Sequence, residues 1–292
     1  MQAPNGVIDV VVENEAEAVS VAKRYLSYFQ GRIADWACAD QRLLRKAIPE
    51  NRLRVYDIRS VVHTLADADS VLELRARFGV GIITALIRIE GRPFGVIANN
   101  PAHLGGAIDA DASDKGARFV QLCDAHDLPI ISLTDTPGFM VGPDAERQAL
   151  VRRACRMFVN GATVTVPYFT IVLRKGYGLG AMAMAGGHYH ASIFSVSWPT
   201  GEFGGMGLEG AVRLAYRKEL AAIDDPLERE AEFRKRVALS YERGKAISTA
   251  SVLEIDDVID PADTRRWILR GLNSVAVQPP RAGKKRTQIE PW

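Results

Sequence analysis

The order of apolar and polar positions predicts strands and helices that alternate along most of the chain. Two apolar runs at 81–89 and 94–99, joined by a short turn, predict a β-hairpin. A helix with an apolar stripe is expected over 112–126, followed by a buried strand over 129–135. This alternation is typical of a layered α/β domain.

Elements are also expected on either side of this region. Asp111 or Ser113 is the expected N-cap of the helix over 112–126. The N-terminal pattern predicts a strand at 6–12 and an amphipathic helix at 15–29. The remaining expected elements are a short helix at 60–65, a helix at 145–160, a strand at 164–173, helices at 208–214 and 226–243, and closing segments at 251–255 and 261–272.

The same pattern suggests how the chain is divided. Periodicity is lost between residues 31 and 58, which we interpret as a linker. We therefore expect a small piece at 1–30, the linker at 31–58, and a main domain at 59–292.

Composition is that of an ordinary globular protein. The 292 residues are 47% hydrophobic and 25% charged, and 37 basic against 35 acidic residues give a net charge of +2. No long block of like charge marks a nucleic-acid partner. The basic cluster from Arg281 to Arg286 is expected to be a solvated tail, with contact to a phosphate-bearing ligand or a partner subunit as the alternative.

Cysteine use and hydropathy bear on location. Cys38, Cys123 and Cys155 lack the CxxC spacing of a zinc or redox site, which favours reduced thiols. No apolar run reaches the ~18 residues that a membrane span needs. We expect a cytoplasmic protein with no membrane partner.

The most informative segment follows the strand expected at 164–173. Arg174 and Lys175 lead into a glycine turn from Gly176 to Ala181 and then a helix of small residues. The first amides of a helix have no intrahelical partners and lie at the positive end of its dipole. Such a helix start suits an oxygen that becomes negative during a reaction.

A second strand also ends in a glycine loop, at Gly138 and Phe139. If the two strands are neighbours, amides from both loops could hold one oxygen atom as an oxyanion hole. Gly138 and Phe139 are therefore candidates for supporting donors. Each loop alone is ordinary turn chemistry, since glycine commonly follows a strand.

Other catalytic arrangements receive little support. Ser132, His126 and Asp135 could be imagined as a triad, but the sequence has no nucleophile elbow. His188 and His190 alternate in an expected extended segment without a third ligand, so no metal is predicted.

A set of motifs occurring in a fixed order resembles the carboxyltransferase (beta) subunits of biotin-dependent acyl-CoA carboxylases. The similarity is to their C-terminal domain, with propionyl-CoA carboxylase beta as the nearest type, and covers about residues 58 to 275. The motifs span Gly91 to Pro101, Gly105 to Asp109, Asp114 to Phe119, Asp135 to Gly142, Leu173 to Met182 and Ser197 to Thr200.

The resemblance implies a crotonase-like (ClpP/crotonase) α/β fold of repeated ββα units, with the active site at a subunit interface. It implies that carboxybiotin releases CO2, that the biotin ureido group takes a proton from the acyl α carbon, and that the enolate attacks CO2. The amides of Gly180 and Ala181 would stabilise the ureido oxygen. The cofactors would be biotin on a separate carrier protein and a coenzyme A thioester of the acetyl or propionyl class.

Further residues near the turn become candidates for binding substrate. Ala183 stands where relatives often carry a larger or acidic residue that lines the acyl pocket, which suggests a different or roomier pocket. Tyr177 and Gly178 belong to the same turn. Arg174 and Lys175 could orient a bicarbonate or carboxylate, and a structural ion pair is an equal alternative.

Only the end of the family's N-terminal domain resembles residues 1–30, so the half that binds acyl-CoA is not seen. We expect the chain to need an N-terminal domain or subunit, besides a biotin carboxyl carrier and biotin carboxylase, in a homo- or hetero-oligomer. An engineered fragment, a shortened gene product and a natural split subunit remain open. The alternatives for function are a biotin-dependent decarboxylase or transcarboxylase subunit and a non-catalytic scaffold.

Overall fold

The computed structural model describes residues 1–276, 283, 285, 286, 289 and 290. Within them, eight strands form one mixed sheet in the order β1-β2-β3-β4-β5-β6-β8, and β7 pairs with β5 beyond the end of β6. This mixed architecture confirms the predicted α/β class. The strands are β1 (Leu72–Leu74), β2 (Ile82–Ile89), β3 (Arg92–Asn99), β4 (Ile130–Thr136), β5 (Tyr168–Tyr177), β6 (Phe194–Ser197), β7 (Glu202–Gly204) and β8 (Asp257–Val258).

The predicted hairpin is confirmed. Strands β2 and β3 pair antiparallel from Ile82 opposite Asn99 to Ile89 opposite Arg92. The two residues between them, Glu90 and Gly91, both have positive φ, of 50° and 74°. Positive φ at both central positions is the conformation whose twist matches a two-residue hairpin.

Strands β3, β4, β5, β6 and β8 run parallel to one another. Parallel strands require crossover connections, which the helices provide. The carboxyl ends of these strands therefore lie at one edge of the sheet, where the glycine loops after β4 and β5 meet.

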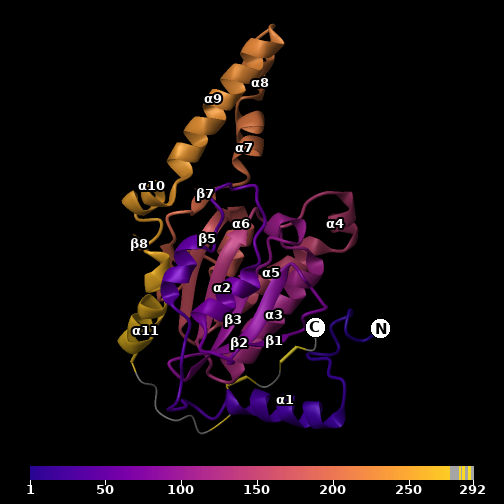
Figure 1. The fold of residues 1–292 in the computed structure, drawn as a ribbon. Coiled ribbons are helices and arrows are strands. Elements are labelled where there is room, and N and C mark those ends of the chain that lie inside the picture. The colour runs from indigo at the N-terminus through magenta and orange to yellow at the C-terminus, as the bar shows by residue number, and fades with distance from the viewer. Residues whose placement is uncertain (277–282, 284, 287–288, 291–292) are drawn as a thin grey trace.

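Helices cover both faces of the sheet (Figure 1). The α-helices are α1 (Glu15–Ser27), α2 (Ile58–Leu65), α3 (Ala110–Ala125), α4 (Pro143–Arg147), α5 (Leu150–Thr163), α6 (Gly178–Met184), α7 (Leu208–Ala215), α8 (Arg217–Ala221), α9 (Pro226–Gly244), α10 (Ala246–Ser251) and α11 (Thr264–Ser274). Short 3₁₀ helices are η1 (Gln41–Lys46), η2 (Leu104–Gly106) and η3 (Pro261–Asp263).

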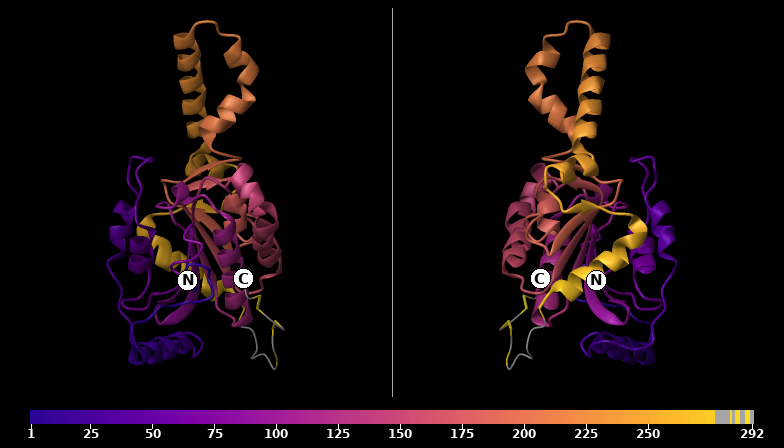
Figure 2. Two further views of the ribbon diagram at one scale, coloured as in Figure 1. Left: turned by 90° about the vertical axis from the view of Figure 1, so that its right-hand side faces the viewer. Right: turned by 90° about the vertical axis from the view of Figure 1, so that its left-hand side faces the viewer.

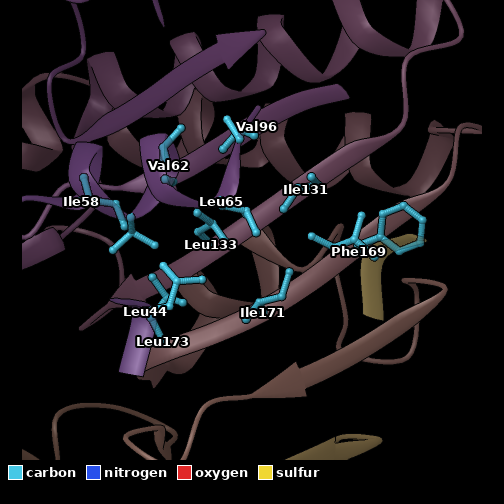
Figure 3. Close-up of a cluster of buried hydrophobic side chains, with 14 of the residues drawn as sticks. Leu44, Ile58, Val62, Leu65, Val96, Ile131, Leu133, Phe169, Ile171 and Leu173 are labelled. Carbon is cyan, nitrogen blue, oxygen red and sulfur yellow. The ribbon is translucent and has the colours of Figure 1, made fainter. Parts of the chain in front are cut away.

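Alternating side chains of each strand serve two apolar clusters on opposite faces. Ile131 and Leu133 of β4 join the cluster covered by α2, η1 and α11, whereas Ile130 joins the cluster covered by α3 and α5. Each fully buried side chain of this size contributes roughly 1.5–3 kcal/mol. Figure 3 shows the first cluster, with Leu44, Ile58, Val62 and Leu65 lying against Val96, Ile131, Leu133, Phe169, Ile171 and Leu173.

Three local predictions were wrong. Residues 6–12 form no strand; Gly6 has a φ of 82°, and the nearby edge strand β1 pairs with β2 alone. The helix expected at 145–160 is two helices, α4 and α5, because Ala149 between them is left-handed with a φ of 55°. Helix α3 begins earlier than predicted, and its N-cap is Asp109, whose Oδ1 accepts from the amide of Ala112 at 2.8 Å.

The segment 31–58, expected to be a linker, packs along the body of the domain. Leu44, Ile48 and Tyr56 are buried in the cluster beneath α2 and α11. Its backbone also bonds to the domain, since the amide of Ile33 donates to the carbonyl of Gly91 at 3.1 Å. The segment thus contributes to the core, and the division into domains stays a prediction.

Helices α7, α8 and α9 project away from the sheet as one extension, which we call the arm (residues 208–244) (Figure 2). Several apolar side chains of the arm are exposed, including Leu214 and Leu227. In the part of the chain that the structure describes, no helix is long and apolar enough to cross a membrane. A cytoplasmic location stays a prediction.

The described basic residues of the C-terminal cluster form ion pairs with the domain, in place of the solvated tail that was expected. Lys285 and Arg286 both pair with the buried carboxylate of Asp124 on α3, at 2.9 and 2.6 Å. Burial opposes ionisation of Asp124, but the amide of Thr165 and these two cations outweigh it and lower the pKa of Asp124. Gly283 is described and exposed, whereas positions 281, 282 and 284 of the cluster lie outside the described residues.

Candidate active site

The two glycine loops come together as predicted. Strands β4 and β5 are parallel neighbours, and Thr136 near the end of β4 lies opposite Gly176 near the end of β5. The pairing shifts register between Thr134 and Thr136. A shift of this kind bends a strand and redirects the residues that follow it, here the loop with Gly138 and Phe139.

The closest approach between the loops is at Gly180. A β-carbon built on Gly180 would lie 2.7 Å from both the α carbon and the carbonyl carbon of Gly138, and 3.0 Å from the amide nitrogen of Phe139. Contacts this short leave no room for a side chain at this position. The first turn of α6 therefore packs directly on the backbone of the neighbouring loop.

The two candidate amides of that loop differ in their partners. Gly138 donates its amide to the Thr136 hydroxyl at 3.1 Å. The carbonyl of Gly138 accepts from the amide of Ile108 at 3.0 Å, which fixes the loop against the segment that follows η2. The amide of Phe139 has no hydrogen-bond partner among the residues that the structure describes. Phe139, and not Gly138, is therefore the donor that the loop leaves free.

The entry into α6 differs from the predicted turn. Strand β5 continues through Arg174 and Lys175 to Tyr177, beyond its expected end at residue 173, because its last residues pair with β7. The chain turns at Gly178, whose φ of 59° is left-handed. A β-carbon there would lie 2.7 Å from the carbonyl oxygen of Gly205, so both the backbone angle and the space require glycine.

Gly180 and Ala181 are the third and fourth residues of α6, and both are buried. A helix leaves about its first four amides without partners. Gly180 lies within this set, whereas Ala181 lies at its limit, where the carbonyl of Tyr177 becomes available as an acceptor. The structure thus brings the Gly180 end of α6 beside the free amide of Phe139, and a small negatively charged oxygen is what such donors hold.

Arg174 and Lys175 do not present free cations to a substrate. Arg174 is 3% exposed, and its guanidinium pairs with the fully buried carboxylate of Asp135 at 3.0 Å. The hydroxyl of Tyr56 donates to the same carboxylate at 2.9 Å. Lys175 is 3.4 Å from Asp135, and its ammonium also donates to the carbonyl of Gly105. Burial lowers the pKa of Lys175, opposed by the charge of Asp135.

The structural alternative for Arg174 is therefore the one observed. Its two remaining bonds, to the carbonyls of Arg52 and Arg54, tie the segment before α2 to the end of β5. The sequence did not identify Tyr56 or Arg52 as partners in this network. In the sequence, only Asp135, near the end of an expected buried strand, indicated that a cation would have to lie nearby.

Ala183 and Tyr177 also differ from their expected roles. Ala183 is 3% exposed and packs in the apolar cluster with Tyr168 and Met184, so its side chain does not line an open pocket. A bulky or charged residue there would disturb the core. Tyr177 is 3% exposed as well, and its hydroxyl donates to the carboxylate of Glu202 at 2.9 Å.

A cavity of about 730 Å³ adjoins the entry into α6. It lies between α6, β7 and the junction of α9 with α10. Gly178, Met182, Phe203 and Gly205 contribute to its wall. The cavity therefore adjoins the turn that Gly178 makes.

The alternative catalytic groups are not assembled. Ser132 is fully buried within β4, whereas the ring of His126 lies against that of Phe29, 4.7 Å between centroids. His188 and His190 lie in a turn, not in an extended segment, and Nδ1 of His188 accepts from the amide of His190 at 3.1 Å. Among the described residues, no group of three or more His, Cys, Asp or Glu could hold a metal ion.

Comparisons with known proteins agree on one family. The chain matches the carboxyl transferase domain over residues 1–288. It is 34% identical over 284 residues to the methylmalonyl-CoA carboxyltransferase 12S subunit of Propionibacterium freudenreichii subsp. shermanii, covering 94% of this chain and 54% of the relative. It is 35% identical to the biotin-dependent acetyl-/propionyl-coenzyme A carboxylase beta6 subunit of Mycobacterium bovis, covering 97% and 60%.

A solved structure is similar at higher identity. It is that of a single-chain, multi-domain long-chain acyl-CoA carboxylase, 58% identical, with a TM-score of 0.86 over 92% of this chain and 26% of that chain. The chain spans a little over half the length of the curated relatives that it matches.

Proposed function

The chain belongs to the carboxyl transferase domain family, and we propose that it is the carboxyltransferase component of a biotin-dependent acyl-CoA carboxylase. The structural match confirms the crotonase-like α/β fold. The reaction that we propose moves CO2 from carboxybiotin to the α carbon of an acyl-CoA. The part of the molecule that supports this proposal is the junction of the two glycine loops.

The observation that carries the proposal is the contact of Gly180 with the backbone of Gly138 and Phe139. It brings a helix start and an unpaired loop amide to the same end of the sheet. Carboxybiotin would supply the CO2 and the group that accepts the α proton. The amides of this chain would hold the biotin ureido oxygen while it carries negative charge, and one such donor is worth about 3 to 4 kcal/mol.

This chain would supply one half of the active site. The second half, which binds acyl-CoA and stabilises its enolate, would come from an N-terminal carboxyltransferase domain or subunit. The length of the relatives supports this division, since the chain covers 54% of the 12S subunit. We propose further that the assembly is a homo- or hetero-oligomer that receives biotin from a carrier protein charged by a biotin carboxylase.

We propose a long-chain acyl-CoA as the substrate, beyond the acetyl and propionyl class expected from sequence. The supporting observation is the 58% identity to the long-chain acyl-CoA carboxylase, compared with 35% to the acetyl-/propionyl-coenzyme A carboxylase subunit. Ala183 no longer supports a choice of acyl group, because its side chain lies in the core.

A second candidate function is carboxyl transfer in the reverse direction, as in a decarboxylase, or coupled to a second transfer, as in a transcarboxylase. It is favoured by the similarity to the methylmalonyl-CoA carboxyltransferase 12S subunit. The same amides would serve both directions, because the ureido oxygen carries its charge in each. A non-catalytic scaffold would not require a left-handed glycine at the entry to α6. We therefore consider the scaffold the weakest of the three candidate functions.

The experiment that tests the proposal reconstitutes the full reaction. The chain is mixed with the N-terminal half of the long-chain enzyme's carboxyltransferase, a biotin carboxylase and a biotin carrier, with ATP and labelled bicarbonate. We expect acid-stable label in product only when both halves are present, and more with palmitoyl-CoA than with acetyl-CoA. Faster decarboxylation of malonyl-CoA than carboxylation would favour the second candidate. A stable assembly without label in any direction would favour the scaffold.

A further inference from the structure

The carboxylate of Glu202 in β7 lies between the entry to α6 and the base of the arm. Its Oε2 accepts the Tyr177 hydroxyl at 2.9 Å. Its Oε1 lies 3.7 Å from the guanidinium of Arg52. The two oxygens therefore have separate partners, and the side chain of Glu202 is itself only 19% exposed.

Tyr177 is the residue from which the chain enters α6. It is the N-cap residue of the helix, with an extended backbone, directly before the left-handed Gly178. Its ring is almost completely buried. Burial and then the charge of Glu202 raise the pKa of Tyr177, so the hydroxyl keeps its proton and donates it to the carboxylate.

Arg52 holds the other side of the carboxylate. Its guanidinium carbon lies 3.4 Å above the ring of Tyr241 in α9. The hydroxyl of Tyr241 donates to Glu209 in α7 at 2.7 Å, which fixes the ring of Tyr241 against α7, another helix of the arm. Besides Tyr177, the position of Glu202 thus depends on Arg52 in the segment 31–58 and, through Arg52, on Tyr241 in the arm.

The backbone of β7 also supports the turn at Gly178, because it pairs with the last residues of β5. Lys175, Gly176 and Tyr177 pair with Glu202, Phe203 and Gly204. Gly178 then passes so close to the carbonyl of Gly205 that a β-carbon would lie 2.7 Å from it. The hydrogen bond from the Tyr177 hydroxyl to Glu202 is a side-chain contact that joins these two segments.

We propose that Glu202 is a positioning residue for the oxyanion-binding amides, acting through Tyr177 on the first turn of α6. The inference rests on the proposed function, because it assigns a role in the same site. Glu202 touches no reacting atom. An oxyanion donor works only within a narrow distance of the oxygen, and a displacement of about 1 Å can cost roughly 100-fold in rate.

Three substitutions test the role in the reconstituted enzyme. Tyr177→Phe and Glu202→Ala each remove the bond, and we expect each to lower kcat roughly tenfold with little change in KM for acyl-CoA. The double variant should lose no more than either single variant, because both delete one interaction. Glu202→Gln retains an acceptor for the hydroxyl and should restore most of kcat.

Tyr28→Phe is the matched control. It removes another buried hydroxyl bond, to the carbonyl of Ser70, far in sequence from α6. We expect a comparable change in thermal stability but unchanged kcat. An equal loss of kcat in this control would mean that general stability, and not position, is measured, and would overturn the inference.

A second readout does not depend on activity. Deuterium uptake of the peptide covering 178–184 should rise in Tyr177→Phe and Glu202→Ala and stay at the wild-type level in Tyr28→Phe. Wild-type kcat and uptake in both test variants, or additive losses in the double variant, would overturn the positioning role. Absence of carboxyl transfer by the wild-type assembly would instead contradict the proposed function, while the exchange measurement would still decide whether Glu202 holds α6.

Discussion

Gly180 of α6 packs on the backbone of Gly138, with no space between them for even one methyl group. A β-carbon on Gly180 would lie 2.7 Å from the Gly138 carbonyl carbon. This contact places the start of the helix and the loop after β4 at a fixed separation. The geometry of the proposed oxyanion hole depends on that separation.

Gly180→Ala should therefore damage catalysis. The added methyl group has to push α6 away from the loop, and we expect kcat for carboxyl transfer to fall by about 100-fold, within the range seen when an oxyanion donor is lost. Gly210→Ala is a matched control, because that exposed glycine in α7 has only ordinary contact, 3.5 Å to Met206. Full activity in Gly180→Ala would show that the separation is not critical.

The buried pair of Asp135 and Arg174 should be essential for stability. Asp135→Asn leaves the nearly inaccessible guanidinium of Arg174 without a countercharge. We expect the free energy of unfolding to fall by about 3 kcal/mol or more, as when one partner of a buried pair is removed. Urea denaturation measures this loss.

The control for that prediction is an exposed pair. Asp144 and Arg147 form a 2.6 Å contact with side chains 90% and 76% exposed. Asp144→Asn should change the free energy of unfolding by less than about 1 kcal/mol. Similar effects of the two substitutions would contradict the assignment of Arg174 to a structural role.

Lys115 on α3 predicts a pH dependence of stability. The residue is 2% exposed, and burial lowers its pKa from 10.5 to about 8. Between pH 8 and 10.5 the unfolded chain binds the proton more tightly, so stability contributed by this group should rise with pH over that window. Below pH 8 the cost of burying the charge is fully present.

Lys115→Met should remove this cost. At pH 7 we expect the free energy of unfolding to increase by up to about 3 kcal/mol, the equivalent of the pKa shift. The increase should be mostly lost by pH 10.5, because the wild-type lysine is then neutral in the folded state and only half protonated in the unfolded chain. Urea denaturation of both proteins at pH 7 and pH 10 provides the comparison, and an equal difference at the two values would contradict the buried charge.

The parts of the fold set by local pattern could be predicted from the sequence. Alternation along 81–89 and 94–99 predicts the hairpin because both strands and their turn are contiguous. The glycines after two apolar strands likewise indicate loops, and their meeting requires only that β4 and β5 be neighbours. Residues 6–12 have a similar local pattern, but a strand also needs an edge to pair with, which sequence does not supply.

The partners of the site residues could not be predicted, since they depend on packing between distant segments. Arg174 resembles a substrate-binding cation in sequence, but β4 places Asp135 beside it and Tyr56 from the N-terminal segment completes the network. The sequence also does not reveal which of the two loop amides, Gly138 or Phe139, lacks a hydrogen-bond partner. The bond from Gly138 to Thr136 follows from the turn geometry and not from the presence of glycine.

The most direct test of the proposed active site is a biotin-dependent reverse reaction with the backbone donor removed. The chain and its N-terminal half are mixed with malonyl-CoA and free biotin, and the acetyl-CoA formed is measured. We expect biotin-dependent turnover that Ala181→Pro abolishes, because proline has no amide proton, and that Ala181→Gly retains. Equal turnover by the proline variant would contradict the assignment of the Ala181 amide to the oxyanion hole at the start of α6.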